Sequence, residues 1–119
     1  MAISNTQRTL KYLRDNGAIV DVVERFNTFI GPHGKRHDCF GFGDILAISG
    51  NDIIMVQSTG QGFAEHDRTI LGNEAAPKWL EAGGRIQLIA WRKIKEKRGG
   101  KRMIWSPRIK EYNLEHYDG

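Results

Sequence analysis

Two polar side chains interrupt apolar stretches of this sequence, and they are the first candidates for chemistry. Asp44 lies in FGFGDILAI, and Gln57 follows thirteen positions later in IIMVQSTG. A carboxylate is costly to bury unless it is paired or binds a cation. Two such interruptions on consecutive strands predict a metal site built on a sheet. Their oxygen atoms, with a backbone carbonyl near Ser58, would suit a hard cation such as Mg²⁺ or Mn²⁺ that keeps several waters.

A cation bound at this position would indicate hydrolysis of a phosphodiester as the reaction. A carboxylate-held Mg²⁺ beside a phosphodiester lowers the pKa of water and stabilises the charge of the transition state. The alternative is structural: Asp44 would be a strand-edge residue, and Gln57 a surface residue of an alternating strand.

Further candidate ligands come from the first half of the chain. Glu24 is a possible third metal ligand, because a carboxylate from the first elements would complete such a site; the alternative is an outward-facing strand residue. His33, His37 and Cys39 have the ligand types of a zinc site. Their spacing is not standard and no fourth ligand is obvious, so we expect loop histidines and a buried cysteine.

Length and composition indicate one soluble domain. The chain has 119 residues, enough for one hydrophobic core, and 39% of them are hydrophobic. Cys39 is the only cysteine, which fits a reducing cytoplasm. The N-terminal sequence lacks the apolar core of a signal peptide, and no segment is long and apolar enough for a membrane span, so we expect a cytoplasmic protein with no membrane partner.

The positive charge is concentrated in residues 92–110. This segment holds nine of the 18 Lys and Arg residues and one acidic residue, Glu96, whereas residues 1–91 hold the other nine against ten Asp and Glu. Such a patch fits a polyanion, and DNA is the expected partner; the alternative is a solvated basic hairpin that keeps the protein soluble. The candidate nucleic-acid-binding residues are Lys35, Arg36, Arg92, Lys93, Lys95, Lys97, Arg98, Lys101 and Arg102.

The order of predicted elements is α-β-β-β-α-β-β, an α/β sandwich. We expect a helix from Asn5 or Thr6 to about Asn16, a strand at 19–26, a loop at 31–37, and strands at 40–48 and 53–59. A helical segment follows at 63–82, broken near Gly72 or Pro77. A strand at 85–94, a turn at Gly99 and a strand at 101–112 complete one domain.

This order and several motifs resemble the PD-(D/E)XK nuclease superfamily. The relevant residues are the Gly-Asp of FGFGDILAI on the second strand and the Q-x-T of MVQSTG where E-x-K is usual. With RHDCFGFGDILAI, Arg68, WLEAGGRIQLIAWRK and Trp105, the chain is similar to small phage-type proteins related to Holliday-junction resolvases and the VRR-NUC group. The resemblance covers roughly residues 8–110 and implies a restriction-endonuclease-like αβββαβ core, a mixed sheet flanked by helices, with an extra C-terminal strand.

The resemblance also implies roles for individual residues. Asp44 would be the metal-binding aspartate, and Gln57 stands at the place of the second acidic ligand. Thr59 stands at the place of the catalytic lysine, and its hydroxyl carries no positive charge. Arg68 on the following helix would supply that charge, with Lys35 or Arg36 as substitutes.

The implied activity is a Mg²⁺- or Mn²⁺-dependent DNA endonuclease, acting on branched DNA in the manner of a resolvase and encoded by a phage in a bacterial host. Resolvase-like members often form dimers, so the resemblance leaves a homodimer open. Two other hypotheses remain: a nuclease fold without catalysis that binds DNA or serves assembly, and an inhibitor or adaptor that binds a host protein.

Overall fold

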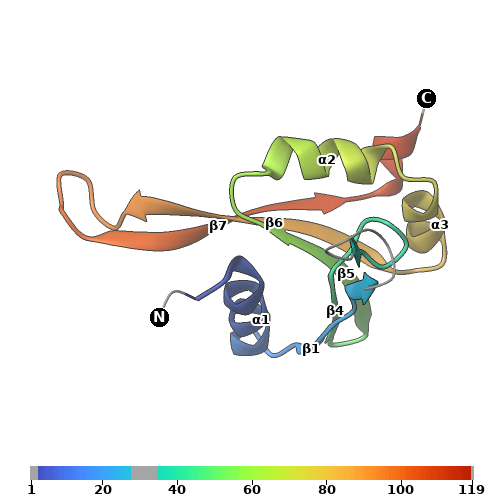
Figure 1. Ribbon diagram of the computed structural model, residues 1–119, viewed down its shortest axis with the longest axis horizontal. Helices are drawn as coiled ribbons and strands as arrows, with labels where there is room; N and C mark the ends of the chain where they lie inside the picture. The colour runs from blue at the N-terminus through green and yellow to red at the C-terminus, as the bar shows by residue number, and fades with distance from the viewer. Residues whose placement is uncertain (1–2, 28–34, 119) are drawn as a thin grey trace.

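The chain forms an α/β fold in which three helices flank a five-stranded mixed sheet (Figure 1). A computed structural model describes the backbone of residues 3–27 and 35–118. The elements are α1 (Asn5–Asp15), β1 (Ile19–Val22), β2 (Arg25–Asn27), β3 (Lys35–His37), β4 (Ile45–Ser49), β5 (Asp52–Thr59), α2 (Phe63–Leu71), α3 (Ala75–Glu81), β6 (Arg85–Lys95), β7 (Met103–Tyr112) and a 3₁₀ turn, η1 (Leu114–Tyr117).

The sheet is covered on both faces. Its strand order is β1-β4-β5-β6-β7, with β5 and β6 parallel and the other neighbours antiparallel. Since successive strand residues point to opposite faces, Val56 packs toward Leu13 of α1, and Met55 packs toward Ile70 of α2. The continuous apolar run of β5 therefore reflects burial on both sides.

The segment between the parallel strands is helical and interrupted, as predicted. α2 ends at Gly72, and Asn73 then accepts hydrogen bonds through Oδ1 from the backbone N–H groups of Ala75 (2.8 Å) and Ala76 (3.0 Å). These bonds satisfy N–H groups that would otherwise lack partners at the start of α3. Pro77 is the third residue of α3, within the first turn, where proline is tolerated. No helix in the described residues is long and apolar enough to span a membrane.

Two boundaries around the first strands were predicted incorrectly. The single strand expected at 19–26 is divided into β1, which joins the main sheet, and β2, which pairs with β3 in a separate antiparallel ribbon. Part of the expected loop at 31–37 is therefore a strand, with Arg25 opposite His37. His33 lies outside the described residues. Strand propensity does not encode whether a strand joins the main sheet or pairs with its neighbour in a separate ribbon.

The strand expected at 40–48 begins only at Ile45. Phe40 and Gly41 both have positive φ, at 55° and 83°, so the chain turns sharply before it enters β4. Cys39 and Gly43 form an isolated antiparallel bridge across this turn. A side chain at Gly43 would meet Met55, since an ideal Cβ there lies 2.2 Å from Met55 Cγ. The next residue, Asp44, directly precedes β4.

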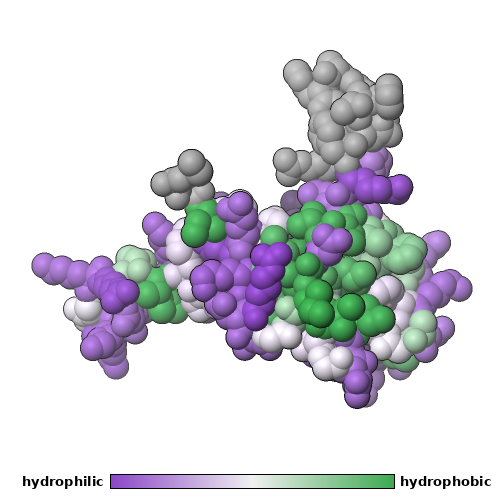
Figure 2. All heavy atoms as spheres, turned by 90° about the horizontal axis from the view of Figure 1, so that it is seen from below, coloured by the Kyte–Doolittle hydropathy of each residue, from purple (hydrophilic) through white to green (hydrophobic). Residues whose placement is uncertain are grey.

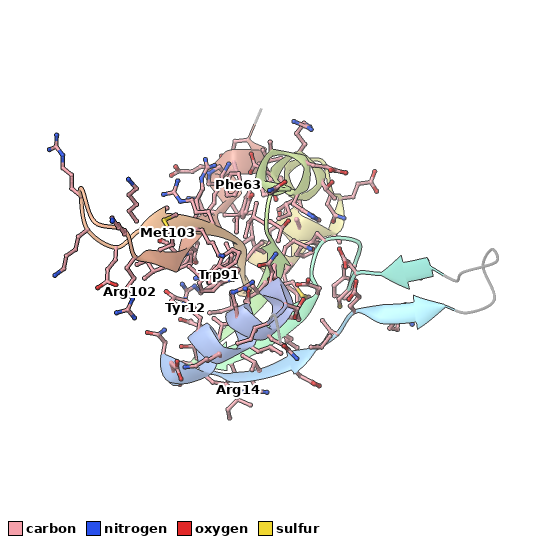
Figure 3. The ribbon with its side chains drawn as sticks, turned by 60° about the vertical axis from the view of Figure 1, so that its left-hand side comes forward. Tyr12, Arg14, Phe63, Trp91, Arg102 and Met103 are labelled. Carbon is pink, nitrogen blue, oxygen red and sulfur yellow. The ribbon has the colours of Figure 1, made fainter. Side chains whose placement is uncertain are left out.

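The predicted C-terminal hairpin is present and reaches beyond the body of the protein (Figure 1). β6 and β7 pair from Ile86–Tyr112 to Lys95–Met103, and Gly99 adopts a positive φ of 78° in the connecting turn. In Figure 3, Arg102 and Met103 lie on the projecting part, whereas Trp91 lies beside Tyr12 at the junction with α1.

A buried group of polar side chains attaches α1 to the sheet. The Thr9 hydroxyl lies 2.7 Å from Ser58 Oγ and accepts a hydrogen bond from Trp91 Nε1 at 2.8 Å. Both hydroxyls lie within hydrogen-bond distance of the Asn5 carbonyl, Thr9 at 3.0 Å and Ser58 at 3.1 Å. These contacts fix the first turns of α1 against the end of β5.

Thr9→Val is expected to destabilise the fold by about 1–3 kcal/mol, because it leaves the buried indole N–H of Trp91 without an acceptor. Urea unfolding measures the change. Thr69→Val is the matched control: its exposed hydroxyl donates to the Glu65 carbonyl, and water can replace it, so a change within about 0.5 kcal/mol is expected. Equal effects of the two substitutions would contradict this role for Thr9.

Candidate functional site

An open pocket of about 920 Å³ lies at the end of the sheet where β5 meets the N-terminal parts of α1 and α2. Three carboxylates line it: Glu24, Asp38 and Asp44. Arg25, His37, Gln57 and His66 line it as well. The two residues first singled out, Asp44 and Gln57, therefore face the same pocket, from the start of β4 and the end of β5.

Asp44 is the most deeply buried of the three carboxylates. Asp44 is only 6% exposed, and its Oδ1 accepts a hydrogen bond from the Ser58 backbone N–H at 3.1 Å. Burial raises the pKa of Asp44 to about 7; the Ser58 N–H opposes this shift, and the charges of Asp38 and Glu24 add to it. The pocket thus holds a carboxylate whose ionised form is disfavoured by the surrounding protein.

Gln57 is buried, at 5% exposure, so the alternative of a surface residue is wrong. The hydrogen-bonding groups around it assign its amide orientation: Nε2 donates to Asp38 Oδ2 at 3.0 Å and to the Phe42 carbonyl at 2.9 Å. An amide can present oxygen instead of nitrogen by turning over. With oxygen toward Asp38, the two acceptors would repel each other unless a cation lay between them.

The other predicted site residues occupy different positions. Glu24 lines the pocket. Thr59 is half-buried beside Gly62, where an ideal Cβ would lie 3.0 Å from Thr59 Oγ1, and it is not among the pocket residues. Arg68 is exposed on α2, and the structure does not bring it to the pocket. The side chains of Lys35 and Arg36 lie outside the described part of the structure.

Four titratable residues of the pocket were not predicted as site residues: Arg25, His37, Asp38 and His66. Burial raises the pKa of Asp38, and the charge of His66 opposes that shift. His37 Nε2 is buried and has no hydrogen-bond partner among the described residues. The sequence offered one signal, since the polar pair of His37 and Asp38 directly precedes the FGFGD motif.

No protein-family model, curated protein or solved structure matches this chain.

The donor set fits some cations better than others. Within residues 3–27 and 35–118, no three His, Cys, Asp or Glu side chains lie close enough together to hold a metal ion. A closed Zn²⁺ site needs four such ligands. Mg²⁺ is instead bound through one or two carboxylates and keeps several waters. Asp44, with the Gln57 amide oxygen and the carboxylates of Glu24 and Asp38 nearby, suits this second type of site.

The projecting hairpin carries most of the predicted DNA-binding residues on its surface. Arg92, Lys93, Lys95, Lys97, Arg98, Lys101 and Arg102 are all exposed. Of these, only Arg102 forms an ion pair within the described part of the chain, with Glu96 at 3.1 Å. Lys110, by contrast, binds Asp67 of α2 at 2.8 Å, and Arg108 covers the ring of Phe63 at 3.7 Å. The tip is therefore free to contact a polyanion, whereas the base holds α2 in place.

Proposed function

We propose that this protein is a metal-dependent phosphodiesterase that cleaves DNA, built on a restriction-endonuclease-like core. The observation that carries the proposal is the placement of the buried Asp44, with its raised pKa, in one pocket with two further carboxylates and Gln57. Such an excess of negative charge is relieved by a divalent cation. The order α1-β1-β4-β5-α2-α3-β6 also supports the core, since it follows αβββαβ once the β2–β3 ribbon is set aside.

Asp44 would bind the cation directly, and Gln57 would contribute its side-chain oxygen after its amide turns over. Glu24 and Asp38 would hold waters of the cation. The bound Mg²⁺ or Mn²⁺ would lower the pKa of the attacking water and stabilise the negative charge of the transition state. The Ser58 N–H keeps the Asp44 carboxylate oriented by donating to Oδ1.

Two pocket residues take the place of the lysine that is missing at Thr59. Arg25 can bind the nonbridging oxygens of a phosphate through two parallel N–H donors. His66 lines the pocket beside Asp38, so its imidazole can donate a proton to the leaving oxygen or balance its charge. These roles replace the one predicted for Arg68.

Cleavage of labelled single-stranded, duplex and branched DNA with Mg²⁺ or Mn²⁺ tests this proposal. Asp44→Asn should abolish cleavage, His66→Gln should lower the rate about 100-fold, and Arg68→Gln should leave it unchanged. Chelation with EDTA should stop the reaction in the wild-type protein. Failure of the wild type to cleave any of the three substrates with either cation would contradict the proposal.

A second candidate function is a DNA-binding or assembly module that has lost catalysis. Two observations favour it: Thr59 in place of a lysine, and the lack of three closely grouped ligands among the described residues. It predicts DNA binding through the hairpin that is the same in EDTA and in Mg²⁺ and is unaffected by Asp44→Asn. The cleavage assay separates the two candidates.

A further inference from the structure

A second hollow, of about 590 Å³, lies between the hairpin and the first turn of α1. It is lined by two tryptophans, Trp91 and Trp105, and by two cations, Arg92 and Lys93. Trp91 is buried and fixed by Thr9, whereas Trp105 is 41% exposed. Part of the Trp105 ring is therefore open to solvent at the edge of this hollow.

Positive charge is gathered around the exposed ring. The guanidinium of Arg8, from α1, lies 3.7 Å from the centre of the Trp105 ring, and Lys93 Nζ lies 5.3 Å from it. Lys93 is directly opposite Trp105 in the β6–β7 register, so both side chains point to the same face of the hairpin. Neither Arg92 nor Lys93 forms an ion pair within the described residues. The Arg8 guanidinium covers one face of the ring, and the stacked ring and guanidinium together offer a base a planar surface and a phosphate its counter-charge.

This hollow adjoins the carboxylate pocket. At the start of α1, Asn5 lines the hollow and the next residue, Thr6, lines the pocket. Near the end of β5, Ser58 lines the pocket, and Gly60 in the following turn lines the hollow. The Ser58 hydroxyl donates a hydrogen bond to the Asn5 carbonyl at 3.1 Å, and this contact lies between the hollow and the pocket. A chain of nucleotides can therefore pass from one to the other around the N-terminal end of α1, where no acidic side chain lies in the first turn.

We infer that the hollow binds an unpaired segment of DNA, with a base stacked near Trp105 and its phosphate beside Lys93. Stacking requires an exposed base face, which an unpaired nucleotide offers and a duplex interior does not. The inference rests on the proposed function, which places the phosphate to be cleaved in the neighbouring carboxylate pocket. It narrows the proposed substrate to DNA with a single-stranded part. The hairpin tip beyond the hollow contacts backbone phosphates of the adjoining DNA.

Binding in EDTA tests this inference apart from catalysis. Fluorescence anisotropy of a labelled oligothymidylate of about 12 nucleotides, a length typical of such grooves, is compared with a duplex of the same length. Trp105→Ala should weaken single-strand binding about 5- to 100-fold and duplex binding much less, because each stacked base contributes about 1–3 kcal/mol. Trp105→Phe should retain most of the affinity, which separates loss of stacking from misfolding.

Met103→Ala is the matched control. Met103 lies on the same face of the same strand, two residues closer to the tip, and is 48% exposed. The Met103→Ala substitution should leave the affinities for single-stranded and duplex DNA unchanged. If Met103→Ala and Trp105→Ala weaken single-strand binding equally, or if the duplex binds as tightly as the single strand and responds equally to Trp105→Ala, the inference is wrong. Single-strand binding through Trp105 without any metal-dependent cleavage would instead overturn only the proposed function.

Discussion

Asp44→Asn should stabilise the metal-free protein at pH 8 while it removes cation binding and cleavage. The wild-type carboxylate is ionised at this pH inside a site that raises its pKa to about 7, so its charge costs folding free energy. Each pKa unit corresponds to about 1.4 kcal/mol, and we expect a gain of about 1–3 kcal/mol once relaxation of the site is allowed for. The Asn oxygen can still accept the Ser58 N–H. Thermal or urea unfolding in EDTA measures the gain.

The stability gained by Asp44→Asn should depend on pH, and the direction follows from the raised pKa. Because the folded-state pKa is raised, the native protein holds its proton more tightly than the unfolded chain. The wild type therefore loses stability as pH rises from about 4 to 7, and the loss is complete above about pH 7. The advantage of Asp44→Asn should be largest at pH 8 and shrink toward pH 4. Glu81→Gln, at an exposed position on α3, should show no such advantage. A less stable Asp44→Asn protein at pH 8 would refute the claim that the site disfavours the charge.

Neutralising the hairpin tip should weaken DNA binding about 100-fold at about 100 mM salt, since a large part of such affinity comes from counterions released by phosphate contacts. The variant replaces four exposed cations by glutamine: Lys95, Lys97, Arg98 and Lys101. The dependence of log affinity on log salt should also become shallower by about 3–4, close to one for each of the four lost contacts. Thermal stability should change little, because the tip projects from the body (Figure 1).

A control with the same change in net charge separates local contact from overall charge. It replaces four exposed cations on the helices by glutamine: Lys11, Arg14, Arg68 and Lys78. This control should retain most of the affinity for DNA. Equal losses in the two variants would mean that the net charge, and not the hairpin, carries the binding.

The surface of the body offers a further contrast with the hairpin. Seen from below, hydrophobic side chains gather over the part of the protein away from the hairpin, whereas the hairpin is mainly hydrophilic (Figure 2). Exposed Ile19, Ile48 and Ile53 lie side by side across β1, β4 and β5. This group of exposed isoleucines thus lies apart from the positively charged hairpin tip.

The features that could be predicted from the sequence are those with a local signal. Glycines and a change of period marked the helical crossover and the hairpin, and polar residues within apolar runs marked Asp44 and Gln57. Helix phase accounts for the position of Arg68 outside the pocket. Two residues along a helix correspond to about 200° of rotation, so Arg68 points away when His66 faces the pocket. The positions of Asp38 and His37 depend on the turn at Phe40, where a non-glycine residue adopts a positive φ, and on the β2–β3 ribbon, and strand propensity predicts neither.

The most direct test of the account is Mn²⁺ binding to the wild type and to Asp44→Asn, measured by calorimetry or electron paramagnetic resonance at pH 6 and pH 8. With the pKa of Asp44 near 7, the wild type should bind about tenfold more tightly at pH 8 than at pH 6, because the ionised fraction of the carboxylate rises by that factor. Asp44→Asn should bind no Mn²⁺ at either pH, and Glu81→Gln should behave as the wild type. No binding by the wild type, or equal binding by Asp44→Asn, would contradict a metal site at Asp44.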